Sequence, residues 1–206
     1  MATTTAPARL YYTGDDEADR LLARDPLALL IGFTLDQQVT VQKAFSGPLE
    51  LKRRLGGRLD AAAIAARDPA ELAALFRQRP ALHRFPGNMA ARVQALCAAI
   101  AHGYGGDAGC IWTEARDGQD LRARLLALPG IGEMKADTIL AVLARRFGLE
   151  LPGLEAVLPD HPTLGNVDSP AALARYQAGK RAYKATLRAG GSAAEAGAAA
   201  MEADAT

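Results

Sequence analysis

The chain has 206 residues, of which half are apolar and 5% are aromatic, and its formal net charge is +1. This length allows one compact domain or two small lobes that share a cleft, and the near-neutral charge excludes a protein that is basic throughout. No apolar run is long enough to cross a bilayer, and no basic-then-apolar signal pattern opens the chain. We therefore expect no membrane partner and a cytoplasmic location.

Cysteine and histidine are too few for the common metal sites. The two cysteines, Cys97 and Cys110, cannot supply a four-thiolate cluster, and their spacing matches no zinc motif. The three histidines are scattered along the sequence. We therefore predict no metal site, no iron–sulfur cluster and no redox or organic cofactor.

Alanine and leucine are abundant and β-branched runs are few, which predicts an all-α fold. Residues 1–12 are expected to be a flexible N-terminus. After a first helix over about 17–24, Asp25-Pro26 has the form of an N-cap and a first helical residue. Residues 27–35 are almost wholly apolar, which predicts a helix buried on all sides. Ser46-Gly47-Pro48 is expected to break the helix that follows.

Apolar spacing and capping residues predict further helices over 61–66, 70–77, 89–103 and 119–127. Another helix is predicted over 133–147, and residues 149–167, with three prolines, are predicted to be a loop. Ser169-Pro170 begins the last helix. The Ala/Gly/Glu-rich segment 189–206 is predicted to be a disordered tail, which leaves one folded domain over 13–188.

The last predicted helix is basic. Residues 169–188 contain no acidic residue and five basic ones: Arg175, Lys180, Arg181, Lys184 and Arg188. Such a helix suits a phosphate backbone, and it equally suits a solvated surface. The sequence leaves both interpretations open.

The most informative segment is 125–137, which predicts a helix end, a short turn and a new helix start. Pro129 fixes φ and removes a donor, while Gly130 and Gly132 permit backbone conformations that other residues resist. The turn presents backbone N–H groups beside the positive end of the next helix, which begins near Glu133. These features predict an anion site that suits a phosphate, although a tight connection that serves packing alone has the same pattern.

Three segments resemble the base-excision DNA glycosylases of the HhH-GPD superfamily. Leu128-Pro129-Gly130-Ile131-Gly132 is similar to the family's helix-hairpin-helix, here over 125–147. Residues 29–40 are similar to its early apolar helix ending in a Gln-Gln turn, and residues 85–92 to the segment leading into its middle helix. The resemblance spans about 25–188 and implies the two-lobed glycosylase fold, its cleft between the lobes.

The family uses an Asp beyond the hairpin to stabilise a sugar with oxocarbenium character and to activate water. By this resemblance Asp168, in a Val-Asp step at a helix start, is the first choice for that carboxylate. Asp160, in Leu-Pro-Asp, is the second choice and has a counterpart in the alkylpurine branch. Both lie further from Gly132 than is usual in the family. An ordinary helix-capping role explains either residue as well.

Bifunctional members of the family place a nucleophilic Lys two positions after the last hairpin Gly, where this chain has Met134. Lys135 follows one residue later, turned by roughly 100° around the helix, so it should miss the cleft and contact solvent or a phosphate. The resemblance therefore implies a monofunctional glycosylase, without strand cleavage, in which Met134 lines the base pocket.

The resemblance also implies the contacts with damaged duplex DNA. The backbone of Gly130, Ile131 and Gly132 would bind phosphate with support from Lys135, and the hairpin carbonyls could hold a monovalent cation. Gln37 and Gln38 would fill the gap left by a flipped base or read the opposite strand, unless they only cap the break between two helices. A nucleoid-associated monomer is expected.

Two alternatives to catalysis stay open. One is a helix-hairpin-helix DNA-binding protein that keeps the fold without the reaction, which the long 149–167 segment and the distant carboxylates favour. The other is a helical protein–protein adaptor. The damaged base is likewise open: the predicted monofunctional chemistry and lack of a cluster favour alkylated purines, and uracil remains an alternative.

Overall fold

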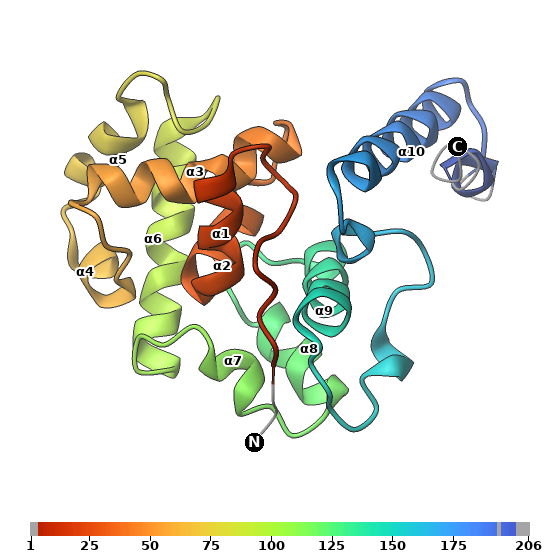
Figure 1. Ribbon diagram of the computed structural model, residues 1–206. Helices are drawn as coiled ribbons and strands as arrows, with labels where there is room; N and C mark the ends of the chain where they lie inside the picture. The colour runs from red at the N-terminus through yellow and green to blue at the C-terminus, as the bar shows by residue number, and fades with distance from the viewer. Residues whose placement is uncertain (1–3, 193–194, 201–206) are drawn as a thin grey trace.

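The structure, a computed structural model, describes residues 4–192 and 195–200, and this part of the chain contains helices and no strand (Figure 1). The all-α prediction is confirmed. The α-helices are α1 (Asp16–Arg24), α2 (Pro26–Leu35), α3 (Val41–Arg54), α4 (Ala61–Ala66), α5 (Pro69–Arg77), α6 (Pro86–Gly103), α7 (Cys110–Thr113), α8 (Gly118–Leu126), α9 (Glu133–Phe147) and α10 (Pro170–Arg188). Two 3₁₀-helices, η1 (Glu155–Val157) and η2 (Leu164–Asn166), lie within the predicted loop. None of the described helices is both long and apolar enough to span a membrane.

The helices pack in two groups around one continuous core. Helices α1 to α6 contact one another, with α6 against α2, α4 and α5, while α9 contacts α8 and η2. As predicted, every residue of α2 from Leu27 to Leu35 is buried. Its N-cap, Asp25, accepts hydrogen bonds from the N–H groups of Leu27 and Ala28 at 3.0 and 3.1 Å. The buried α2 thus fixes the position of the turn that follows it.

The N-terminal segment is packed, which corrects the expectation that residues 1–12 are flexible. Residues 1–3 lie outside the described part. Leu10 and Tyr12 are fully buried, and the Tyr12 hydroxyl donates to the Leu164 carbonyl oxygen at 2.9 Å. The N–H of Leu10 donates to the Asp19 carbonyl oxygen at 3.0 Å. Two large apolar side chains reaching the core outweigh the polar composition of this segment.

Helix α3 passes through Pro48 without a break, contrary to the expectation for Ser46-Gly47-Pro48. A Cβ on Gly47 would lie 2.5 Å from Cδ1 of Leu35, so the glycine lets α3 press closely against α2. Pro48 and Leu49 are also buried. Tertiary packing here outweighs the hydrogen bond that proline removes from the helix.

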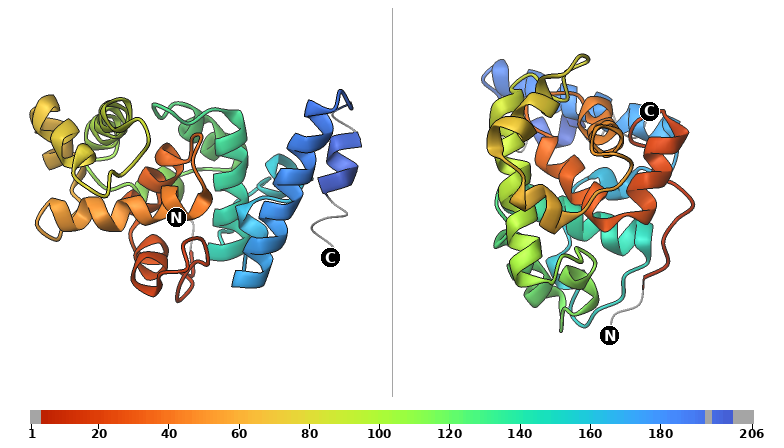
Figure 2. Two further views of the ribbon diagram at one scale, coloured as in Figure 1. Left: turned by 90° about the horizontal axis from the view of Figure 1, so that it is seen from above. Right: turned by 90° about the vertical axis from the view of Figure 1, so that its left-hand side faces the viewer.

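The segment beyond α10 is partly folded, which corrects the prediction of a disordered 189–206 tail. Residues 195–200 are helical, Ala196 is fully buried, and a Cβ on Gly179 of α10 would lie 2.8 Å from the Ala200 carbonyl oxygen. Residues 193–194 and 201–206 lie outside the described part. Helix α10 contacts η2 near its start and then projects from the rest of the molecule beside this short helix (Figures 1 and 2).

Candidate nucleic-acid interface

The turn between α8 and α9, residues 128–134, is hereafter the hairpin turn. Gly130 has φ +84°, in the left-handed region, so only glycine adopts it without strain. Gly132 has φ −92°, which any residue can adopt, and a Cβ there would meet no atom within 4 Å. The two glycines therefore differ: Gly130 shapes the turn, and Gly132 leaves open space above it.

The hairpin turn exposes unpaired donors. Helix α9 has no side-chain N-cap, and within the described part of the chain four N–H groups have no acceptor, those of Gly130, Gly132, Glu133 and Met134. These residues are exposed. Free N–H groups at the positive end of a 15-residue helix are donors suited to an anion, and the anion site at this turn stays a prediction.

Ile131 does not present its N–H to an anion, which corrects its assignment as a backbone phosphate contact. Its N–H donates to the Leu128 carbonyl oxygen at 3.1 Å, and the side chains of Leu128 and Ile131 are buried. Ile131 instead anchors the turn in the core. The anion-binding donors lie on either side of it.

Lys135 is turned inward rather than toward solvent, contrary to the expected solvent or phosphate contact. Its half-buried ammonium donates to the carbonyl oxygens of Gly130 at 3.3 Å and Thr34 at 3.5 Å. Burial lowers the pKa of Lys135 to about 8, and the charge of Asp36 partly opposes that effect. Lys135 thus joins the hairpin turn to the end of α2.

This contact also bears on a monovalent cation at the hairpin. The Gly130 carbonyl oxygen already accepts from an ammonium group, and the Leu128 carbonyl oxygen accepts from Ile131. A second cation at these oxygens would meet the charge of Lys135. These two carbonyl oxygens are therefore already engaged, and a monovalent cation at the hairpin stays a prediction.

The second element of the surface is the turn between α2 and α3, residues 36–40, hereafter the glutamine turn. Gln37 is held from two sides: its side-chain oxygen accepts from Arg92 at 2.7 Å, and its carbonyl oxygen is 2.8 Å from Nε2 of His83. Gln38 is exposed, has φ +54°, and makes no side-chain hydrogen bond with the described residues. Of the two predicted glutamines, only Gln38 is free to reach a ligand.

His83 links the glutamine turn to the start of α6. It is buried, and its Nδ1 accepts from the N–H of Phe85 at 3.0 Å, so Nε2 carries the proton donated to Gln37. Burial lowers the pKa of His83, which keeps the ring neutral. Phe85 itself is 41% exposed, with the Arg84 guanidinium 4.7 Å from its ring centroid. An aromatic ring and two arginines thus border the glutamine turn.

Asp36 is a carboxylate that the sequence analysis missed. It caps the C-terminus of α2 and is half-buried, and its charge acts on two other elements, raising the pKa of Lys135 in α9 and of Tyr176 in α10. Burial is the larger cause of the raised Tyr176 pKa. No local pattern marks Asp36, because these neighbours lie about a hundred or more positions away along the chain.

The predicted catalytic carboxylates are both exposed. Oδ1 of Asp160 lies 3.5 Å from Nδ1 of His161, and both side chains are exposed. Asp168 immediately precedes Ser169, and it is Ser169, not Asp168, that caps α10 by accepting from the N–H of Ala172. The capping alternative therefore does not apply to Asp168.

Met134 is 83% exposed, and its assignment to a base pocket stays a prediction. The hollows described on the surface lie elsewhere, near Lys43 and near Glu114. Among the described residues, no three histidine, cysteine or carboxylate side chains gather as a metal site.

Comparisons with protein-family models, curated proteins and solved structures give no match for this chain.

Proposed function

We propose that this protein binds duplex DNA through the hairpin and glutamine turns and hydrolyses the N-glycosidic bond of a damaged or mispaired base. One observation carries the proposal: three segments far apart in sequence converge on one surface. Lys135 contacts Thr34 at the end of α2, and His83 and Arg92 both contact Gln37. These are the segments whose resemblance to the HhH-GPD glycosylases led to this function.

The physical basis for DNA binding is a set of donors without acceptors beside arginines. A phosphate at the hairpin turn would accept from the N–H groups of Gly132, Glu133 and Met134, in the space above Gly132. A neighbouring phosphate would meet Arg84 or Arg92. Under this proposal α1–α6 and α7–α9 are the two lobes of a helix-hairpin-helix glycosylase, and binding weakens as salt rises.

Base flipping would use the exposed side chains of the same surface. Gln38 lies at a turn tip and Phe85 is partly exposed beside Arg84, so each can enter a base stack from the groove. Gln37 is held by His83 and Arg92, so we assign it to positioning Gln38.

For catalysis we propose Asp168 as the carboxylate that stabilises the oxocarbenium character of the sugar and orients water, with Asp160 as second choice. Asp36 is a third candidate because it belongs to the glutamine turn and its charge acts on Lys135 in α9 and Tyr176 in α10. The position at which bifunctional members carry a nucleophilic lysine is Met134, which has no amine. The Lys135 ammonium donates to two carbonyl oxygens. We therefore propose a monofunctional enzyme, and the lack of a lyase amine favours alkylated purines as substrates.

A strand-nicking assay tests this function. Duplexes with one alkylated adenine, uracil, hypoxanthine or oxidised guanine are incubated with the protein and analysed with and without hot alkali. We expect breaks only after alkali, because hydrolysis leaves an intact abasic strand. Breaks without alkali would contradict the monofunctional assignment.

Replacement of the carboxylates then locates the chemistry. We expect Asp168→Asn to lower the single-turnover rate by about a hundredfold or more and to leave DNA affinity unchanged, because the amide keeps the shape and loses the charge. Asp160→Asn removes an equally exposed carboxylate and should retain activity, and loss of turnover in it would favour the second choice instead. Loss of turnover in Asp36→Asn instead would move the carboxylate to the glutamine turn.

The exposure of Asp160 and Asp168 favours one alternative, a DNA-binding protein without catalysis. No described side chain orients either carboxylate except His161 beside Asp160. This alternative predicts that duplexes are bound and that no lesion in the panel gives breaks with alkali.

A further inference from the structure

Helix α10 carries a basic face that the two turns do not use. Given 3.6 residues per turn, Lys180, Arg181, Lys184 and Arg188 lie within roughly 100° of arc. Among the described residues none of the four forms an ion pair, and no acidic residue lies between 169 and 188. Because the whole chain is only +1, the rest of it is net negative and the positive charge is concentrated here.

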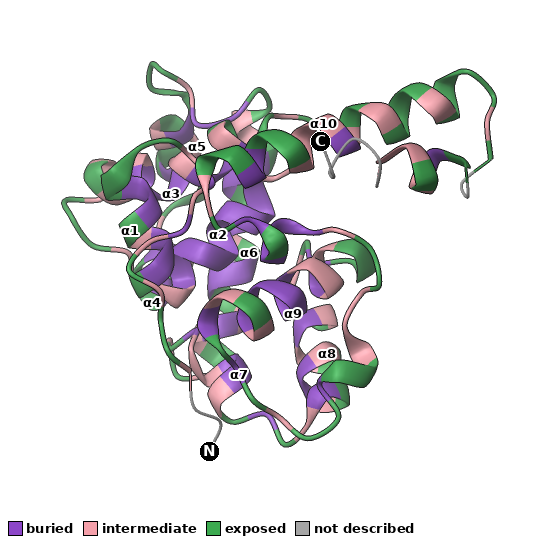
Figure 3. Ribbon diagram, turned by 45° about the vertical axis from the view of Figure 1, so that its right-hand side comes forward, coloured by how far each residue is buried: buried purple, intermediate pink, exposed green. Residues whose placement is uncertain are grey.

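Among the described residues of this face, Arg181, Lys184 and Arg188 are exposed and Lys180 is partly buried. The short helix over 195–200 packs against Gly179, on the side of α10 roughly 150° from the centre of the basic face. Figure 3 shows exposed and intermediate residues alternating along the projecting part of α10, with the C-terminal segment beside it. Lys180 and Lys184, and Lys184 and Arg188, are like-charged neighbours four residues apart, an arrangement that is unfavourable without an anionic partner.

The start of α10 fixes the direction in which this face points. Gln177 donates to the side-chain oxygen of Gln42 in α3 at 2.8 Å, and Leu173 is buried. Gln177 lies within the arc of the basic face. The same side of α10 that docks beside the glutamine turn therefore continues outward as the basic face.

We infer that the basic face of α10 binds the phosphate backbone of the same DNA duplex, on one side of the base held at the two turns. This inference rests on the proposed function. The 19 residues of α10 extend about 28 Å, the length of roughly eight base pairs at 3.4 Å each. Lys180, Lys184 and Arg188 follow one another at about 6 Å along the axis, a row of point charges suited to a strand of phosphates.

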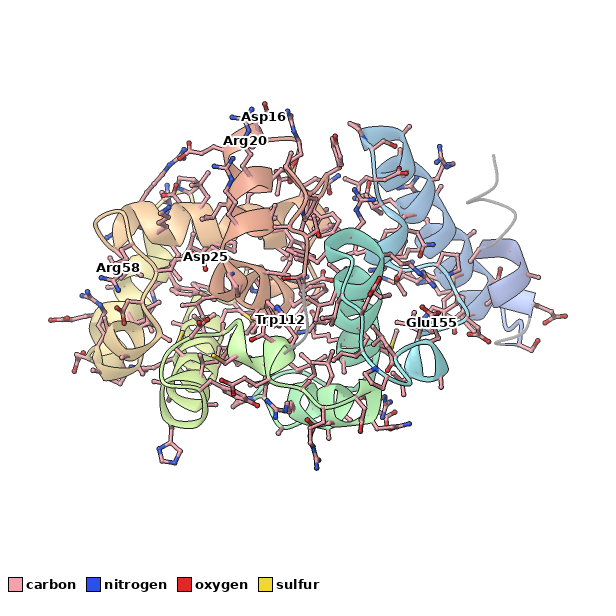
Figure 4. All side chains as sticks on the ribbon, turned by 60° about the horizontal axis from the view of Figure 1, so that its bottom comes forward. Asp16, Arg20, Asp25, Arg58, Trp112 and Glu155 are labelled. Atoms are coloured by element: carbon pink, nitrogen blue, oxygen red, sulfur yellow. The ribbon has the colours of Figure 1, made fainter. Side chains whose placement is uncertain are left out.

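The test compares two variants that lose the same charge. The first, K180Q/R181Q/K184Q/R188Q, neutralises the basic face. The control, R20Q/R53Q/R58Q/R116Q, neutralises four arginines that each pair with a carboxylate. Arg58 lies on the side of the molecule opposite α10, and Arg20 lies beside Asp16 in α1 (Figure 4). Circular dichroism confirms that both variants are folded.

Binding to a duplex of about 24 base pairs, with a tetrahydrofuran abasic analogue at its centre, is measured across a salt series. The slope of log K against log salt is about −0.9 for each phosphate neutralised. We expect the basic-face variant to flatten the slope by about 3 and to weaken binding by about tenfold or more near 0.1 M salt, while the control changes the slope by less than about 1. Equal slopes for the two variants would overturn the inference.

Shortening the duplex tests on which side of the abasic analogue α10 binds. Removing about eight base pairs from one flank of the analogue should abolish the difference between the two variants, and removing them from the other flank should preserve it. If both variants bind DNA like wild type while the basic-face variant alone loses binding to anionic phospholipid vesicles, the partner is a membrane surface and the inference is wrong. In that case the proposed function, tested by strand nicking with wild-type protein, still stands.

Discussion

The hairpin turn and the glutamine turn each connect two helices, and Lys135 links the first to the end of α2 just before the second. The two turns are held in place by different means. The hairpin turn is set by its own backbone: Gly130 has a left-handed conformation and no side chain caps α9. The glutamine turn is held by distant side chains, His83 and Arg92. The hairpin turn therefore presents unpaired backbone N–H donors. The glutamine turn is a loop held by side-chain hydrogen bonds, and it leaves Gln38 exposed.

The strongest test of this difference replaces the two hairpin glycines. Gly130→Val should destabilise the fold by about 1–2 kcal/mol, because a β-branched residue resists φ near +84°, and should weaken DNA binding by at least about tenfold. Gly132→Ala should leave the free energy of unfolding unchanged, since its Cβ meets no atom, and should still weaken binding by obstructing the phosphate. Urea unfolding and duplex titration measure both effects. Unchanged binding in Gly132→Ala would contradict the phosphate site.

The glutamine turn should respond to pH through His83. Burial lowers the pKa of His83, so the unfolded chain takes up the proton at higher pH than the folded one. Stability is therefore full above about pH 6.5 and is lost as pH falls from there toward the lower pKa of the folded protein. His83→Gln should be less stable by about 1–2 kcal/mol near pH 8 and should lack this decline.

Urea unfolding at several pH values measures the difference in the free energy of unfolding between wild type and His83→Gln. Titrating groups that the two proteins share cancel in this difference. A constant difference between about pH 8 and 5.5 would show that His83 does not titrate with folding.

The carboxylate of Glu133, beside the unpaired N–H groups of the hairpin turn, offers a test with a smaller expected effect. Glu133 is exposed at the first position of α9, where its carboxylate repels a phosphate bound at the same N–H groups. Glu133→Gln should tighten duplex binding by about two- to fivefold, mostly at low salt, while Glu150→Gln, an exposed control in the 149–167 segment, should have no effect. Weaker binding by Glu133→Gln would place the DNA elsewhere.

The smallest effect concerns the contact of Lys135 with the hairpin turn and the end of α2. Lys135 has a pKa of about 8, so its amine should react with an acylating reagent at lower pH in the folded protein than in urea, where a lysine titrates near 10.4. Asp36→Asn should lower this pKa further, because the Asp36 charge opposes the burial effect. Mass spectrometry of the Lys135 peptide across a pH series measures both shifts. Identical profiles in the folded and unfolded chains would mean that Lys135 is not buried at this contact.

The same contrast explains what the sequence could predict. The buried α2, the N-cap Asp25 and the hairpin turn follow from local patterns of apolar residues, caps and glycine, and the structure contains them. The contacts of Asp36, His83 and Arg92 that matter here join residues 46 or more positions apart, so no local pattern reveals them. The inward Lys135 and the exposed Met134 depend on how α9 meets α2, which spacing along one helix does not determine.

The same limit applies to the ends of the chain. Polar or alanine-rich composition suggested flexible termini, but Leu10, Tyr12 and Ala196 are buried against partners far along the sequence. Pro48 within α3 is a further example, because the close contact of Gly47 with Leu35 decides the outcome.

The most direct test of one DNA surface formed by two different turns is amide NMR of the protein titrated with a duplex that contains the abasic analogue. We expect the backbone N–H signals of Gly132, Glu133 and Met134 to shift together with those of Gln38 and Phe85, at the same duplex concentration. Shifts confined to α10, or absent from the hairpin turn, would contradict this account.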